Sequence, residues 1–136
     1  MLFNKILYLV PPEIILQLTD LLENETNKIQ FVCQAIGVPV PYIRWYFNGV
    51  MVNLSDSSKY NSSSVHLNES IIESTLSIKD ANSSDVGTYT CQAENIIGTS
   101  QSFGILTVNG MCLDVDVHKC KQIISYMHID VLVFIL

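Results

Sequence analysis

Charged residues are scarce in this chain, and basic residues are the scarcer kind. Only 15% of the 136 residues are charged, and 7 Lys and Arg against 13 Asp and Glu give a formal net charge of −6. Such a chain offers few contacts to phosphate backbones or anionic lipids, so neither nucleic acid nor a membrane surface is expected as a partner. Hydrophobic residues make up 49% of the chain, which excludes the composition of a disordered protein. The length and composition predict one folded domain with a tail.

Long apolar runs and catalytic motifs are also missing. No run reaches the roughly 18 to 20 residues of a membrane-spanning helix. The three histidines, His66, His118 and His128, stand in no recognisable nucleophile motif with serine or cysteine, and no glycine-rich phosphate-binding loop occurs. The sequence therefore predicts a protein that is not an enzyme and holds no cofactor.

The four cysteines are Cys33, Cys91, Cys112 and Cys120. An even number permits a disulfide framework without requiring one. Cys112, His118, Cys120 and His128 are metal-ligand types, but their spacing matches no structural zinc pattern, so no metal site is expected. A second disulfide and two free thiols remain alternatives for Cys112 and Cys120.

Asparagine is placed unusually often before serine and threonine. Five positions read Asn-x-Ser/Thr without proline between: Asn24, Asn53, Asn61, Asn68 and Asn82. Ten Asn and 21 Ser plus Thr in 136 residues would give about 1.5 such N-glycosylation sequons by chance. Serine-rich loops offer one explanation for the excess. The other, which we favour, is a glycosylated domain of a secreted or cell-surface protein, where disulfides persist.

The two ends of the chain differ from its middle. Residues 1–10 contain one lysine and the apolar run Ile6–Val10, which is shorter than the core of a signal peptide and lacks a cleavage site. Pro11-Pro12 then suits an edge strand. Residues 11–109 are expected to form the domain. Residues 110–136 end in the apolar Val131–Leu136 and are expected to be the start of a membrane span, a flap on the domain, or an end without a folded role.

From residue 11 to 109 apolar and polar residues alternate with a period of two, broken by turn residues. The residues expected to face a core are Ile29, Phe31, Cys33 and Ala35; Ile43, Trp45 and Phe47; Leu76 and Ile78; Tyr89, Cys91 and Ala93; and Leu106 and Val108. Asn48-Gly49 predicts a hairpin, with Val50 and Val52 beginning the return strand. Residues 53–70 are expected to form loops with one or two short edge strands. This pattern predicts an all-β fold of two packed antiparallel sheets.

Two cysteines and the only tryptophan share the predicted inward side of their strands. Cys33 precedes Trp45 by 12 residues and Cys91 by 58. This placement allows a Cys33–Cys91 bridge to join the two sheets beside the indole. In the loop-entropy picture such a bridge would stabilise the fold by about 4 kcal/mol.

The stretch from Asp85 to Cys91 adds a second local signal. Tyr89 lies two residues before the cysteine, where the hydroxyl of a tyrosine corner bonds to upstream backbone. Asp85 requires a cation, and Lys59 is the candidate partner for an ion pair.

Together these motifs resemble the immunoglobulin superfamily, and within it the I-set. The matching residues are Cys33-x-Ala35-x-Gly37-x-Pro39-x-Pro41-x-Ile43-x-Trp45, then Leu76-x-Ile78, then Asp85-x-Gly87-x-Tyr89-x-Cys91-x-Ala93-x-Asn95-x-x-Gly98. The resemblance covers residues 11–109 and implies an immunoglobulin-like sandwich with a core around Trp45, Leu76 and Tyr89. The interval from Trp45 to Leu76 is longer than the family pattern, so a longer connection or an extra edge strand is expected there.

The resemblance also implies a binding face. In this family the C, F and G strands share a sheet, and here they would be residues 42–47, 87–95 and 99–108. Strand alternation would place seven residues on the outer face of that sheet: Tyr42, Arg44, Tyr46, Gln92, Glu94, Phe103 and Ile105. Tyrosine, arginine and large apolar side chains are typical of interface centres, and none of the sequons falls on these strands. This face is expected to contact a protein, either a like domain or a ligand, although scattered surface apolar residues are ordinary on any domain.

These observations predict a non-catalytic extracellular recognition module of a cell-adhesion or receptor protein. Two alternatives remain: an intracellular structural I-set spacer of a muscle or cytoskeletal protein, and an accessory domain of a receptor kinase or matrix enzyme. Membrane association would come only through a parent chain or the C-terminal tail.

Overall fold

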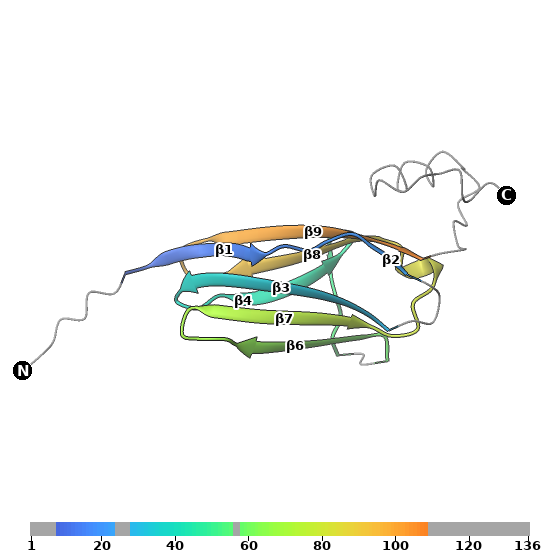
Figure 1. Ribbon diagram of the computed structural model, residues 1–136, viewed down its shortest axis with the longest axis horizontal. Helices are drawn as coiled ribbons and strands as arrows, with labels where there is room; N and C mark the ends of the chain where they lie inside the picture. The colour runs from blue at the N-terminus through green and yellow to red at the C-terminus, as the bar shows by residue number, and fades with distance from the viewer. Residues whose placement is uncertain (1–7, 24–27, 56–57, 109–136) are drawn as a thin grey trace, which may run out of the picture.

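The computed structural model describes residues 8–23, 28–55 and 58–108, which form two packed sheets (Figure 1). The elements are β1 (Val10–Leu16), β2 (Leu21–Glu23), β3 (Ile29–Val38), β4 (Tyr42–Phe47), β5 (Val50–Met51), β6 (Tyr60–His66), β7 (Ile71–Ile78), the short 3₁₀ helix η1 (Ser83–Asp85), β8 (Gly87–Glu94) and β9 (Thr99–Val108). The predicted all-β sandwich is confirmed. In the described ranges no helix is long and apolar enough to cross a bilayer.

The strand order defines the two layers. One sheet runs β1-β3-β7-β6 and the other β2-β9-β8-β4-β5. All pairs are antiparallel except β2, which lies parallel to β9. The N-terminal segment thus leaves the first sheet after β1 and joins the second at β2. Gly104 permits this crossing, because a Cβ there would lie 3.0 Å from the Thr19 carbonyl oxygen.

The core lies between the layers, where the inward side chains of both sheets meet. On β3, every second residue from Ile29 to Ala35 is buried, as the period-two pattern predicts. Leu76, Ile78, Tyr89 and Leu106 are fully enclosed. Ile43 and Phe47 were expected inside, and they are only partly buried while packing against this cluster.

A disulfide and the tryptophan cross the centre of the core. Cys33 on β3 and Cys91 on β8 are bonded, with their Cα atoms 6.5 Å apart, so the bridge joins the two sheets. Trp45 pairs with Cys91 across β4 and β8 and is 2% exposed. Its Nε1–H donates to Ser74 Oγ at 3.0 Å, which satisfies the buried indole without water.

The predicted hairpin forms at Asn48-Gly49, where both residues have positive φ, 47° and 81°. The return strand is shorter than expected. β5 contains Val50 and Met51, both exposed, and Val52 lies beyond it, buried, with its N–H donated to the Trp45 carbonyl. β5 thus ends one residue before Val52, although the hydrogen bond from Val52 to Trp45 continues the pairing with β4.

Residues 53–70 contain more strand than the sequence suggested. β6 is a single edge strand of seven residues, paired with β7 without interruption from Tyr60–Ile78 to His66–Ile72. Serine and asparagine have low strand propensity, but pairing with a neighbouring strand overrides such preferences. This strand occupies much of the long interval between Trp45 and Leu76.

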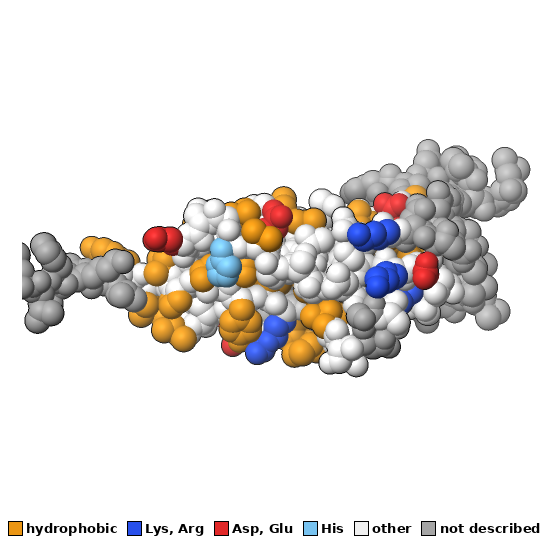
Figure 2. Space-filling model, turned by 90° about the horizontal axis from the view of Figure 1, so that it is seen from below, with side chains coloured by type: hydrophobic (Ala, Val, Ile, Leu, Met, Phe, Trp, Pro, Cys, Tyr) orange, Lys and Arg blue, Asp and Glu red, His pale blue; other side chains and the backbone are white. Residues whose placement is uncertain are grey.

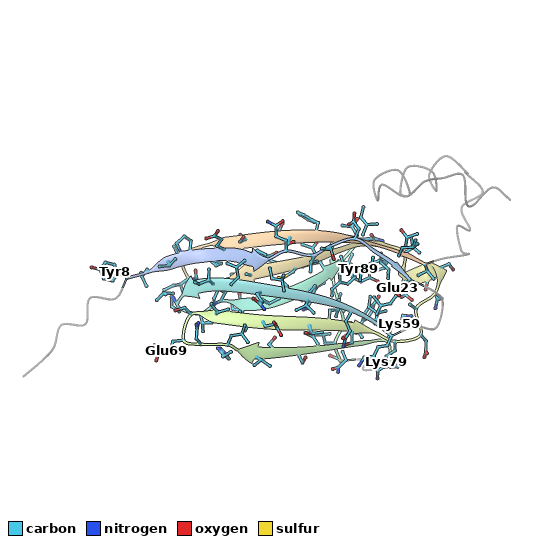
Figure 3. All side chains as sticks on the ribbon, viewed as in Figure 1. Tyr8, Glu23, Lys59, Glu69, Lys79 and Tyr89 are labelled. Atoms are coloured by element: carbon cyan, nitrogen blue, oxygen red, sulfur yellow. A yellow bond between two sulfur atoms is a disulfide. The ribbon has the colours of Figure 1, made fainter. Side chains whose placement is uncertain are left out.

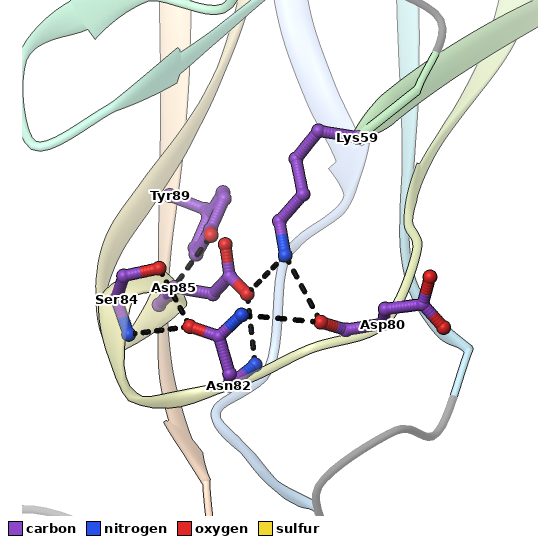
Figure 4. Close-up of polar contacts among 6 residues, drawn as sticks. All are labelled: Lys59, Asp80, Asn82, Ser84, Asp85 and Tyr89. Carbon is purple, nitrogen blue, oxygen red and sulfur yellow. Dashed lines mark hydrogen bonds and ion pairs between the residues drawn. The ribbon is translucent and has the colours of Figure 1, made fainter.

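A polar cluster closes one end of the sandwich (Figure 4). Tyr89 Oη donates to the Asp85 carbonyl oxygen at 2.9 Å, which is the tyrosine-corner bond. Asp85 is 2% exposed, and its Oδ2 accepts from Lys59 Nζ at 2.5 Å and from the Asn82 N–H at 2.9 Å. Lys59 Nζ also donates to the Asp80 carbonyl oxygen at 3.1 Å. The buried carboxylate is thus fully partnered, and burial raises the pKa of the Tyr89 phenol.

We expect Lys59→Met to lower the free energy of unfolding by about 1.5–3 kcal/mol, because it leaves the buried Asp85 carboxylate without its cation. Urea unfolding of the full chain measures the change. Lys28→Met removes the same charge from an exposed residue and is the control. Equal effects of the two substitutions would contradict a stabilising role for the Lys59–Asp85 pair.

The two ends of the sandwich carry different groups. Figure 3 places Tyr8 and Glu69 at one end and Lys59, Lys79 and Glu23 toward the other. At the Tyr8 end, Asn95 Nδ2 donates to the carbonyl oxygens of Val10 at 2.8 Å and Pro39 at 2.9 Å. This amide ties the first strand to the β3–β4 connection.

Candidate protein-interaction surface

The outer side of β4, β8 and β9 carries an apolar row set by strand register. Tyr46 on β4 pairs with Thr90 on β8, which pairs with Phe103 on β9, and Tyr46 also pairs with Met51 on β5. Tyr89 and Cys91 point inward, so Thr90 lies on the outer side of the sheet with its partners, although it is only 6% exposed. Phe103 is 59% and Met51 54% exposed. These four residues cross the sheet from one edge strand to the strand beside the other edge.

A polar group adjoins this row. Arg44 and Glu94 approach to 3.4 Å between Nη1 and Oε2, and the Arg44 guanidinium lies 4.8 Å from the centre of the Tyr42 ring. A hydrogen bond with Glu94 is the main cause that raises the pKa of Tyr42. An exposed pair of this kind adds little stability. It nevertheless places a cation, an anion and an aromatic ring side by side on the surface.

The seven residues expected on this face do lie on one side of the five-stranded sheet. We call them, with Met51, the β4–β8–β9 face. Tyr42 pairs with Glu94 and Arg44 with Gln92, and Ile105 lies two residues beyond Phe103 on β9. Gln92 also accepts a hydrogen bond from Gln101 at 2.9 Å.

Sequence reasoning missed Met51 and Gln101. The signal for Met51 was present, since a two-residue Asn-Gly turn sets Phe47 opposite Val50 and therefore Tyr46 opposite Met51. Gln101 follows only from the register between β8 and β9, which the sequence of one strand does not contain.

None of the described sequons falls on β4, β8 or β9, but Asn53 lies only two residues beyond Met51. Asn53 follows β5, Asn61 is on β6, Asn68 is in the β6–β7 turn, and Asn82 precedes η1. All four are exposed. Asn53, Asn68 and Asn82 each accept a hydrogen bond from the N–H two residues on, at 2.8–3.0 Å. Asn24 falls outside the described residues.

Other candidate chemistry finds no support among residues 8–23, 28–55 and 58–108. No group of three or more His, Cys, Asp and Glu side chains in these ranges is placed to hold a metal ion. Cys112, Cys120, His118 and His128 fall outside them, as does the tail, residues 110–136.

The sandwich, its central disulfide and its tyrosine corner define an immunoglobulin domain, and comparison with known proteins agrees. The family model described as "Immunoglobulin domain" matches residues 11–95, so the chain belongs to this family. Domains of this family are typically non-catalytic binding or structural modules.

Individual relatives come from two kinds of protein. The chain is 29% identical to mouse myopalladin over 101 residues and 35% identical to human contactin-4 over 79 residues, which are 74% and 57% of this chain. It spans 7% of each relative's length. The solved structure of the titin domains Z1Z2 in complex with telethonin has a TM-score of 0.65 at 23% identity, over 76% of this chain and 49% of that one. Relatives thus include extracellular adhesion receptors and intracellular muscle proteins.

Proposed function

We propose that this chain is an extracellular recognition module of a cell-adhesion or receptor protein, and that its β4–β8–β9 face binds another protein. The observation that carries the proposal is that Met51, Tyr46 and Phe103, the exposed or partly exposed members of the row, lie on strands that carry no sequon. Aromatic and methionine side chains at the centre with arginine beside them are typical of binding hot spots.

The polar group of Arg44, Glu94 and Tyr42 supports specificity on the same face. Arg44 and Glu94 present opposite charges side by side, so a partner must offer the complementary pair in the matching order. A second copy of the domain meets this requirement, because a two-fold arrangement can set the arginine of each copy against the glutamate of the other. A ligand with paired charges meets it as well.

The covalent features favour the extracellular setting. A disulfide across the core persists in oxidising compartments and is rare in the cytosol. Four sequons have exposed asparagines, which is the placement that attached glycans require. The opposite setting, an intracellular spacer, is favoured by the similarity to myopalladin. In that setting Cys33 and Cys91 would be reduced and the sequons unused.

Intact mass distinguishes the two settings. The full chain is expressed in secreting cells and its mass is recorded with and without glycosidase and reductant. We expect several glycans and an oxidised Cys33–Cys91 pair, with the pair assigned by peptide mapping. A secreted chain that is unmodified at every sequon and fully reduced would contradict the extracellular proposal and support the spacer.

A further inference from the structure

The two sheets have four edge strands among the described residues, β1, β6, β2 and β5. Three of them have features that prevent pairing with another chain. β1 carries Pro11 and Pro12 and has register shifts on either side of Glu13 and Ile14. β2 has three residues and β5 has two. Proline, irregular register and short length are the ordinary means by which edge strands avoid joining a second sheet.

The fourth edge, β6, has none of these protections. It is seven residues long, its register with β7 is unbroken, and its sequence YNSSSVH contains no proline and no Lys, Arg, Asp or Glu. Figure 2 views the molecule from this side, where backbone and side chains that are neither charged nor hydrophobic occupy much of the centre. Among the described residues no further strand pairs with β6.

The register shows which backbone groups face outward. Lys79 N donates to the Lys59 carbonyl oxygen and Leu67 N to that of Ile71, each at 2.9 Å. Hydrogen-bonded pairs alternate along an antiparallel ladder, so residues 61, 63 and 65 bond to β7. The N–H and C=O groups of the intervening residues, Ser62 and Ser64 among them, point to the free side. No strand among the described residues pairs with them, so a second copy of β6 could do so.

A second copy of β6 would fit this edge, with Asn61 inside the contact. Antiparallel pairing through Ser62 and Ser64 of each copy sets Ser63 opposite its own equivalent and Asn61 opposite Val65 of the other copy. Directly opposed Cβ atoms in such a pair are only about 4.5–5.5 Å apart. Asn61 and Val65 are both exposed, and Val65 offers an apolar surface at that point. Asn61 also begins the sequon Asn61-Ser62-Ser63.

We propose that an N-linked glycan on Asn61 blocks strand pairing at the β6 edge and so keeps two copies of this domain from joining through β6. The inference rests on the extracellular setting proposed above. In the modification, Asn61 Nδ2 forms a bond to the anomeric carbon of an oligosaccharide carried on a lipid pyrophosphate. The bond from that carbon to the pyrophosphate oxygen breaks, the lipid pyrophosphate leaves, and the amide loses one proton. The attached sugar occupies the space that Val65 of a second copy would need.

The test compares variants of the full chain secreted from animal cells, all carrying Tyr46→Asp and Phe103→Asp so that the β4–β8–β9 face does not contribute. Glycopeptide mass spectrometry gives the occupancy of each sequon, and sedimentation equilibrium gives the dimerisation constant. Asn61→Gln and Ser63→Ala each remove the sequon, and we expect each to strengthen dimerisation at least tenfold (about 1.4 kcal/mol). Asn53→Gln, which removes a sequon outside any strand, is expected to leave it unchanged.

Ser63→Lys provides the decisive control. It also removes the sequon, but it sets identical charges opposite each other at the centre of the β6–β6 pair, so this variant is expected to stay monomeric. Dimerisation of Ser63→Lys equal to that of Ser63→Ala would overturn the proposed contact. Monomeric Asn61→Gln, or an Asn61 left bare while other sequons are occupied, would overturn the inference alone. Bare asparagines at every sequon would overturn the extracellular proposal as well.

Discussion

Removing the Cys33–Cys91 bridge is expected to cost about 4 kcal/mol of unfolding free energy, the largest single loss predicted for this domain. The bridge closes a loop of 58 residues, and without it the unfolded chain gains the corresponding conformational entropy. Marginal domains have only about 5–15 kcal/mol of stability in total. The variant Cys33→Ala with Cys91→Ala should therefore unfold at a much lower urea concentration, as followed by Trp45 fluorescence.

Reducing the Cys33–Cys91 disulfide in a chain that keeps both cysteines gives a second measurement of the same effect. The comparison is made in a chain carrying Cys112→Ser and Cys120→Ser, so that the reductant acts on one pair alone. Reductant and the double alanine variant should then lower the free energy of unfolding by similar amounts. A loss below about 1 kcal/mol in both would show that the denatured chain is not expanded enough for loop closure to matter.

Replacing Tyr46 and Phe103 with aspartate is expected to weaken binding through the β4–β8–β9 face by at least about a thousandfold. Each substitution removes an aromatic contact of about 2 kcal/mol or more and sets an unpaired carboxylate in the interface. Phe103 is mostly exposed and Tyr46 partly so, and the folded domain should lose little stability. Sedimentation equilibrium measures self-association, and binding of the fluorescent secreted chain to cells measures ligand capture.

Ile15→Asp is the matched control for this prediction. Ile15 is an exposed apolar residue on β1, in the other sheet, and receives the same carboxylate. It should leave both kinds of binding unchanged. Binding that survives the double substitution, or that is lost equally with Ile15→Asp, would refute the assignment of the face.

The fold was predictable because its signals are local and repeat. The alternation from Ile29 to Ala35 and from Tyr89 to Ala93 marks inward residues on one strand at a time, and that alternation holds in the structure. Partial exposure of Ile43 and Phe47 was not predictable in this way, because it depends on how far the opposite sheet extends over each end of β4. The extent of β6 depends likewise on β7, its partner strand, rather than on its own serines.

For the candidate surface, the sequence predicted which residues share one side of the sheet but not which of them lie next to one another. Alternation assigns Tyr42, Arg44 and Tyr46 to one side of a strand. Which residue lies beside each depends on register, and register joins strands far apart in the sequence, as Arg44 and Glu94 show at a separation of 50. The alignment of Met51, Tyr46 and Phe103 in one row could therefore be known only from the structure. The same holds for the position of Arg44 beside both Glu94 and Tyr42.

The parallel pairing of β2 with β9 has a consequence for a chain under tension. The described chain enters at one end of the sandwich through β1 and leaves at the other through β9 (Figure 1). Once a pull on both ends has separated β1 from β3, it draws β2 and β9 along each other and stretches their hydrogen bonds together rather than in turn. After these strands separate, the disulfide still prevents the residues between Cys33 and Cys91 from extending, and their extended length is about 200 Å. A domain with the disulfide intact would therefore lengthen only a little when pulled, whereas a reduced domain would lengthen by this additional amount.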